Sequence, residues 1–274
     1  MKNLLTLALL SILLYSCGDQ PTQEQAAEKM SDFADDPAFR ELHDEPRSVT
    51  LKHLGTMMEL PAEGGEPANA YVINPGKEQV LFVIQEWWGM NDYIKAEAER
   101  LSDELENTTI VALDMYDGKV ATTREQAQKY MQGATDERLN QIVQAGLTYA
   151  GPDAKIGTIG WCFGGAWSLK TAIAAGERAK ACVMYYGMPV KTAAELAPLQ
   201  APVLGIFAEQ DKYINREVIG KFEALAAATQ KELIVKWYEA DHAFANPTQE
   251  RYNADAAAEA NEYAVDFLAD HLNR

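Results

Sequence analysis

Cys162 is the residue best suited to covalent chemistry, because it lies in the sequence Gly-Trp-Cys-Phe-Gly at residues 160–164. The spacing Gly-x-nucleophile-x-Gly is that of a nucleophile elbow, a sharp strand-to-helix turn, with cysteine here in the position usually held by serine. The turn places the thiol at a helix N-terminus, which lowers its pKa and favours attack on a carbonyl carbon. A glycine-rich turn around a buried, unreactive cysteine would show the same pattern. The chemistry therefore depends on a base and an acid elsewhere in the chain.

His242 is the candidate general base. It lies in the loop Glu-Ala-Asp-His-Ala-Phe at residues 239–244, directly after an apolar run of strand length at 233–238. The other histidines lie in less suitable places: His43 in a polar N-terminal stretch, His53 near the N-terminal edge of the expected sheet and His271 in the last expected helix.

Asp211 is the candidate acid that orients His242, and it follows another apolar run at residues 203–207. Glu209 and Asp241 are rival acids, but Asp241 adjoins the histidine and cannot easily turn back onto its ring. The order nucleophile, acid, base is the one that a fold with a nucleophile elbow requires. The three residues together favour a Cys-His-Asp triad over a structural cysteine.

These residues all follow apolar segments that alternate with helical patterns. The run Val-Leu-Phe-Val-Ile at residues 80–84 is continuously apolar, as in a parallel strand covered on both faces. Further strands are expected at 109–113, 155–159, 181–185, 203–207 and 233–238, and helices at 91–106, 123–150 with a break near Gly133, 164–175, 215–229 and 248–272. The alternation predicts an α/β fold with a doubly wound, mostly parallel sheet. Short strands near 49–54 and 70–73 are expected to form an antiparallel N-terminal edge.

The N-terminus reads as a signal for export. Lys2 precedes an apolar run at residues 4–14, which is too short to span a membrane and has the length of a signal-peptide core. The following Leu-Tyr-Ser-Cys at 14–17 resembles a bacterial lipobox, although Tyr15 departs from the small residue that is usual there. We therefore expect a signal peptide at 1–16, lipidation of Cys17 and attachment to a membrane of the bacterial cell envelope. Simple secretion and an uncleaved anchor are the alternatives.

The rest of the chain divides into a tether and one domain. Residues 17–47 are rich in Gln, Glu, Asp and Ala, and we interpret them as the lipidated cysteine and a flexible tether. A single domain, expected to be monomeric, follows at 48–274.

Charge and composition exclude several partners. The chain has 274 residues, with 24 basic and 41 acidic side chains and a net charge of −17, so a nucleic-acid partner is not expected. No His/Cys cluster has metal-ligand spacing and no glycine-rich phosphate loop is present, so neither a metal nor a cofactor is expected. Cys182 lies in an apolar strand and is interpreted as a core thiol.

Several motifs together resemble the dienelactone hydrolase family of α/β-hydrolases. They lie at residues 83–89 (Val-Ile-Gln-Glu-Trp-Trp-Gly), 112–116 (Ala-Leu-Asp-Met-Tyr), 160–165, 185–187 (Tyr-Tyr-Gly), 211 and 238–246. The resemblance implies the α/β-hydrolase fold, with Cys162 as nucleophile, His242 as base and Asp211 as its orienting acid. It also implies that Glu86 helps to generate the thiolate, and that the backbone N–H groups of Trp87 and Phe163 form the oxyanion hole.

Substrate choice is less defined by the sequence. Trp88, Tyr116, Trp161 and Phe244 lie in or beside the motif loops and suggest an aromatic-lined pocket for a small substrate. The family binds a substrate carboxylate with arginines, but neutral Asn246 stands where one of them is expected, which favours neutral esters or lactones. Arg124 and Arg138 could supply a different cation. We expect an ester or lactone hydrolase with an acyl-enzyme intermediate, with a peptidase or acyltransferase as minor rivals. The alternative is a catalytically idle binding protein of the same fold in the cell envelope.

Overall fold

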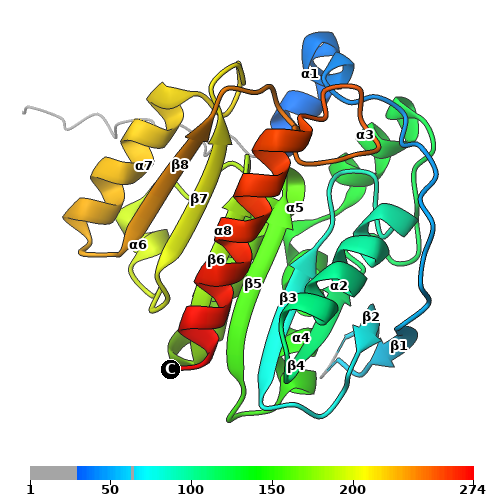
Figure 1. Cartoon of the computed structure of the whole chain (residues 1–274), viewed down its shortest axis with the longest axis vertical. Helices are drawn as coiled ribbons and strands as arrows, with labels where there is room; N and C mark the ends of the chain where they lie inside the picture. Colours follow the sequence, from blue (N-terminus) through cyan, green and yellow to red (C-terminus); the bar gives the residue numbers. More distant parts are fainter. Residues whose placement is uncertain (1–29, 63–64) are drawn as a thin grey trace, which may run out of the picture.

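An eight-stranded sheet runs through the residues that the computed structural model describes, which are 30–62 and 65–274. The strand order is β1-β2-β4-β3-β5-β6-β7-β8 (Figure 1). The strands are β1 Thr56–Leu60, β2 Ala68–Ile73, β3 Gln79–Ile84, β4 Thr108–Leu113, β5 Lys155–Trp161, β6 Ala179–Tyr185, β7 Val203–Ala208 and β8 Leu233–Tyr238. All neighbouring pairs from β4 to β8 are parallel, whereas β1 pairs antiparallel with β2 and β2 with β4. The predicted doubly wound sheet with an antiparallel N-terminal edge is confirmed.

Helices cover both faces of the sheet. They are α2 Asp92–Glu104, α3 Arg124–Gly133, α4 Asp136–Ala150, α5 Phe163–Ala175, α6 Ala193–Leu196, α7 Arg216–Ala228 and α8 Ala254–Leu272, with a short 3-10 turn η2 at Gly176–Arg178. In Figure 1, α2 and α8 lie in front of the sheet, whereas α4 and α5 lie behind it. The expected break near Gly133 is present, because the Thr135 hydroxyl caps a new helix by accepting from the Arg138 amide.

The first edge strand lies later in the chain than predicted. Residues 49–54 form no strand, and β1 begins at Thr56 instead. The reason lies in Glu99 of α2, whose carboxylate accepts hydrogen bonds from the backbone amides of Lys52 (2.6 Å) and Leu54 (3.0 Å). These amides are therefore satisfied by a side chain and not by a neighbouring strand.

The N-terminal segment packs against the domain, which differs from the flexible tether expected there. We call residues 30–54 the N-terminal strap. It contains the 3-10 helix η1 (Met30–Asp35) and the short helix α1 (Pro37–Glu41). Phe39, Leu42 and His43 are buried, so these few side chains outweigh the polar composition around them.

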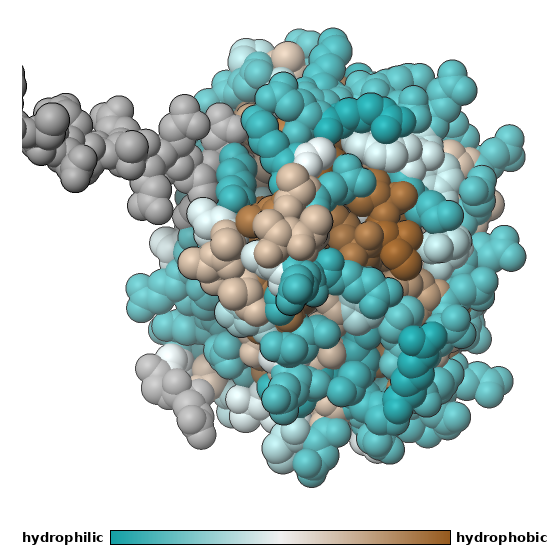
Figure 2. Space-filling model, turned by 90° about the vertical axis from the view of Figure 1, so that its left-hand side faces the viewer, coloured by the Kyte–Doolittle hydropathy of each residue, from teal (hydrophilic) through white to brown (hydrophobic). Residues whose placement is uncertain are grey.

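The predicted signal peptide (1–16) and Cys17 lie outside the described residues. Among the residues that are described, no helix is both long and apolar enough to cross a membrane. Figure 2 shows one face of the molecule, which is mostly hydrophilic with a hydrophobic patch in its upper half.

Candidate active site

The sheet brings the predicted site residues to one edge. Glu86 follows β3, Cys162 follows β5, Asp211 follows β7 and His242 follows β8. Because these strands are parallel neighbours in the order β3-β5-β6-β7-β8, their carboxyl ends lie together. Ligands of open α/β sheets bind at this edge.

The turn at Cys162 has the geometry of a nucleophile elbow. Cys162 has φ 55° and ψ −117°, a conformation that is strained for a residue with a side chain. A Cβ at Gly160 would collide with the Gly164 carbonyl oxygen, and one at Gly164 would collide with the Ile84 carbonyl oxygen. The two flanking glycines are thus required by close backbone contacts.

Asp211 and His242 form a buried hydrogen-bonded pair. The distance from His242 Nδ1 to Asp211 Oδ2 is 2.6 Å, and Oδ1 of Asp211 accepts from the amides of Tyr213 (2.8 Å) and Ile214 (3.0 Å). Burial alone would raise the pKa of Asp211, but the charge of His242 and the hydrogen bonds hold it below its ordinary value. Burial lowers the pKa of His242, yet Asp211 and Cys162 raise it well above its ordinary value. Asp211 therefore fixes the ring with Nδ1 as its donor and stabilises the protonated form of His242, which is the form that a general base takes when it accepts a proton.

Cys162 is enclosed, with 0% of its surface exposed. Its Sγ lies within 4.8 Å of a ring nitrogen of His242, and Nε2 of His242 has no hydrogen-bond partner in the described part of the chain. Burial raises the pKa of the Cys162 thiol, and the nearby His242 opposes that rise. The resting thiol is therefore neutral, with its base within a short reorientation.

His43 is a site residue that sequence reasoning missed. It was assigned to the tether, but it is only 2% exposed and its Nε2 lies 3.6 Å from Cys162 Sγ. Its ring packs against Trp87, with centroids 4.3 Å apart. The spacing of Phe39, Leu42 and His43, at i, i+3 and i+4, is the one helical apolar pattern that could have indicated burial there.

Glu86 faces neutral donors. Its carboxylate accepts from the Asn246 amide (2.6 Å) and the Tyr186 hydroxyl (3.4 Å). Burial raises its pKa to about 7, although these hydrogen bonds oppose the rise. Neither of these hydrogen bonds involves Cys162, so the role in thiolate formation that the family resemblance implies for Glu86 stays a prediction.

The backbone amide of Phe163 donates to the Cys162 thiol, and Trp87 carries the second amide that the resemblance implies for an oxyanion hole. Trp87 follows Glu86 at the end of β3, and Phe163 is the first residue of α5, directly after Cys162. Within the described residues neither amide donates to a backbone carbonyl. Two such donors are what an oxyanion hole needs.

Comparison with known proteins identifies the family of the chain. The sequence model of the dienelactone hydrolase family matches residues 68–272. The chain belongs to the dienelactone hydrolase family. It is 30% identical to the carboxymethylenebutenolidase of Pseudomonas putida over 225 residues, which cover 75% of this chain and 92% of that protein. The protein is thus an ester or lactone hydrolase of this family.

Solved structures show the same fold. A dienelactone hydrolase-like promiscuous phosphotriesterase from metagenomic libraries superposes with a TM-score of 0.68 at 22% identity, covering 80% of this chain and 99% of that one. A dienelactone hydrolase from Anabaena variabilis gives 0.58 at 17% identity, covering 83% and 99%.

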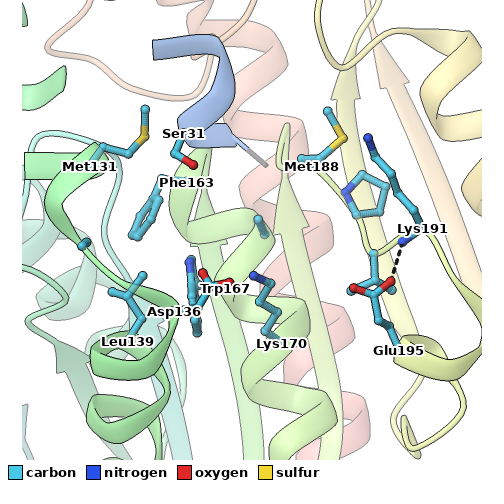
Figure 3. Close-up of a pocket in the computed structure, with 14 residues that line it drawn as sticks. Ser31, Met131, Asp136, Leu139, Phe163, Trp167, Lys170, Met188, Lys191 and Glu195 are labelled. Atoms are coloured by element: carbon cyan, nitrogen blue, oxygen red, sulfur yellow. Dashed lines mark hydrogen bonds between the residues drawn. The ribbon is translucent and has the colours of Figure 1, made fainter. Parts of the chain in front are cut away.

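The aromatic residues predicted to line a substrate pocket are all buried in packing. The Trp161 ring lies against Tyr185, Tyr116 against Phe163 and Phe244 against Tyr186, with centroids 5.4–5.7 Å apart, and Trp88 lies against Trp87 at 5.1 Å. In this dienelactone hydrolase family member a different set of residues lines an open pocket of about 120 Å³ beside α5 (Figure 3). Phe163, Trp167, Met131, Leu139 and Met188 supply its apolar wall. Phe163 adjoins Cys162 in the chain, but Cys162 itself does not line the pocket. The lining also contains the charged side chains of Asp136, Lys170, Lys191 and Glu195.

The cations considered for a substrate carboxylate are engaged elsewhere. Arg124 donates to the His43 carbonyl oxygen (2.5 Å) and pairs with Asp44 (3.3 Å). Arg138 pairs with Asp117 at 2.7 Å and donates to two backbone carbonyls. Asn246, in the position expected for the family's arginine, is fully buried against Glu86.

Proposed function

We propose that the protein hydrolyses small neutral esters or lactones through a Cys162-His242-Asp211 triad and an acyl-enzyme. The observation that supports this most is the buried 2.6 Å contact between His242 and Asp211, with a ring nitrogen of His242 within 4.8 Å of the elbow thiol. Each group has the position its role needs: a nucleophile on a strained turn, a base held in one tautomer, and an acid that stays ionised.

The first half of the reaction forms the acyl-enzyme. His242 Nε2 takes the thiol proton, and Sγ of Cys162 attacks the substrate carbonyl carbon. The carbonyl oxygen gains the electron pair and is stabilised by the N–H groups of Trp87 and Phe163. The tetrahedral intermediate then collapses, the C–O bond to the alcohol breaks, and the alcohol leaves with the proton from His242.

The second half releases the acid. A water molecule gives a proton to His242 Nε2 while its oxygen attacks the thioester carbonyl. The C–S bond breaks, the proton returns to the sulfur and the carboxylic acid departs. For a lactone, the alcohol stays attached to the acyl group and leaves with it.

Neutral, small substrates fit the surroundings best. Neither Arg124 nor Arg138 is available to hold a carboxylate, and the net charge of −17 repels anions. A pocket of about 120 Å³ has room for a group of roughly the size of benzene.

A panel of small esters and lactones, including matched neutral and anionic pairs, tests the proposal. We expect neutral members to be hydrolysed with the higher kcat/KM, and Cys162→Ala to lower kcat by about 10³-fold or more. Cys182→Ala, which removes a thiol outside the site, is the matched control and should retain activity. Rates no higher than the uncatalysed background on every substrate would favour the idle binding protein. Hydrolysis by Cys162→Ala at the wild-type rate would contradict the triad, and a strong preference for anions would contradict the substrate class.

We also propose that the enzyme is held at a membrane of the cell envelope by lipid on Cys17. The support is the apolar run at residues 4–14 followed by Leu-Tyr-Ser-Cys.

A further inference from the structure

Three metal-ligating side chains meet at the nucleophile. Nε2 of His43, Sγ of Cys162 and Nε2 of His242 all lie within 4.8 Å of one another, and all three residues are buried. His43 belongs to the N-terminal strap and His242 to the loop after β8. The three residues are therefore far apart in the sequence and form no recognisable metal-binding motif.

Both imidazoles use Nδ1 in a hydrogen bond, which leaves Nε2 for a metal ion. Nδ1 of His43 lies 3.0 Å from the Phe39 carbonyl oxygen, and Nδ1 of His242 lies 2.6 Å from Asp211 Oδ2. A carbonyl oxygen and an ionised carboxylate only accept, so each Nδ1 is the donor and Nε2 is the ring nitrogen left to ligate a metal. Metal-binding histidines in proteins are held in this way, with the second ring nitrogen donating to a carbonyl or carboxylate.

The thiol of Cys162 cannot donate a hydrogen bond to both imidazoles at once. The single S–H of Cys162 can be given to one Nε2 at a time, and its 3.6 Å contact is with His43. Nε2 of His242 is buried without a hydrogen-bond partner among the described residues. A buried polar nitrogen without a partner costs folding free energy, and a metal ion bound to it would supply the missing partner.

The distances suit zinc. In a tetrahedral site with Zn–S of about 2.3 Å and Zn–N of about 2.0 Å, sulfur and nitrogen lie about 3.5 Å apart. The separation of Cys162 Sγ from His43 Nε2 is 3.6 Å, and the His242 ligand nitrogen lies within 4.8 Å of both, so it needs a shift of at most about 1 Å. One thiolate and two imidazoles are ligands that Zn²⁺ accepts, with a fourth position left for water.

We propose that His43, Cys162 and His242 bind one Zn²⁺ ion, which inhibits the enzyme. On binding, the Cys162 S–H bond and any N–H bond at Nε2 of His242 break, these protons go to solvent, and the freed electron pairs bind the ion. The ion then occupies the lone pairs of both nucleophile and base. It also ties the N-terminal strap to the catalytic loops, because His43 belongs to the strap. The inhibition rests on the proposed function, whereas binding of the ion does not.

Titration of the full-length chain with ZnCl₂ by calorimetry, in buffer free of thiol reductants, tests the site. We expect one Zn²⁺ per chain with a dissociation constant of roughly 1 µM or tighter. His43→Gln and Cys162→Ser should each weaken binding at least ~10-fold. His53→Gln, which alters an exposed histidine of the same strap, should leave binding unchanged. With Co²⁺ as probe, a thiolate-to-metal absorption band should appear in the wild type and be absent in Cys162→Ser.

Ester hydrolysis supplies the second readout. Zn²⁺ should inhibit the wild type at the concentration at which it binds, and EDTA should restore the rate. For each variant, inhibition is compared with its own rate in EDTA. The proposal is overturned if the wild type binds no Zn²⁺, or if His43→Gln binds it as tightly as the wild type. If His43→Gln fails to fold, Cys162→Ser takes its place in this comparison. Binding as expected by a chain that hydrolyses no ester would contradict the proposed function and leave the metal site standing.

Discussion

Glu86 is a buried carboxyl group whose hydrogen-bond donors, Asn246 and Tyr186, are neutral. Its pKa, raised by burial from 4.5 to about 7, makes it a source of pH-dependent stability. Below pH 4.5 the group is protonated in both the folded and the unfolded chain. Between the two values the folded chain binds the proton that the unfolded chain has lost. The free energy of unfolding therefore falls as pH rises through this window, and levels off above about pH 7.

The variant Glu86→Gln should remove this dependence, because the amide oxygen can still accept from Asn246. Relative to the variant, the wild type should lose about 2 to 3 kcal/mol of unfolding free energy between about pH 5 and pH 8. Urea unfolding at both pH values measures the difference. Glu59→Gln, on the exposed strand β1, serves as control and should follow the wild type. Parallel curves for wild type and Glu86→Gln would show that Glu86 is already ionised at low pH.

The sequence predicted the positions of the triad residues, but it did not predict which other side chains pack around the thiol. The positions of Asp211 and His242 followed from the rule that loops after parallel strands meet at one edge, and the structure brings both to Cys162. Their catalytic roles remain predictions. His43 could not be found in this way, because its approach to the thiol depends on packing between segments more than a hundred residues apart.

The N-terminal strap is the element that encloses the site. Asp44 is one of the residues that attach the strap to the domain: its carboxylate accepts from Arg124 (3.3 Å) and the Glu250 amide (3.1 Å). Its backbone exchanges two hydrogen bonds with the Gln249 side chain, at 2.7 and 2.9 Å. With this strap in place, Cys162 is fully buried, so a substrate needs the strap or its side chains to move.

Asp44→Ala should loosen the strap and expose the thiol more often. We expect iodoacetamide to alkylate Cys162 several-fold faster in this variant, because reaction requires the opened state. Cys182, buried in β6 with a pKa raised to about 11 by its burial, should stay slow in both proteins. Glu217→Ala, which removes a surface ion pair on α7, is the matched control. Mass spectrometry of the alkylated peptides gives both rates. An unchanged rate at Cys162 would mean that the thiol is reached by a route independent of Asp44.

Elements were predictable where hydrophobic pattern and caps agreed. The central strands read directly from continuous apolar runs, and β8 has the expected bounds, Leu233–Tyr238. The exposed strand β1 carries little pattern, and α6 has only four residues, too few for a periodic signal. In the strap, composition indicated a tether, but four residues (Ala34, Phe39, Leu42 and His43) are buried against the domain.

The whole molecule combines an acidic body with an N-terminal sequence that resembles an export and lipidation signal. A net charge of −17 does not favour contact with an anionic membrane surface, so attachment would depend on the lipid at Cys17. A single acyl chain binds membranes only marginally, whereas several chains hold a protein firmly.

Cys17→Ser should abolish lipidation and processing at that site. The wild type, expressed in a bacterium, should partition into the detergent phase, and the variant should lose that partitioning or keep an uncleaved signal. Cys182→Ser is the control for loss of a cysteine elsewhere. Unmodified mature protein in the aqueous phase from the wild-type gene would contradict the anchor.

The central claim, that Cys162 is acylated during turnover, is tested most directly by trapping the intermediate. Wild type and His242→Gln are mixed with an activated ester such as p-nitrophenyl acetate, quenched with acid and digested, and the acylated peptide is identified by mass spectrometry. We predict an acetyl group on Cys162 in the wild type, with slower release in His242→Gln because the base for the attacking water is gone. An acetyl group on another residue, or steady ester hydrolysis by Cys162→Ala at the wild-type rate, would contradict the account.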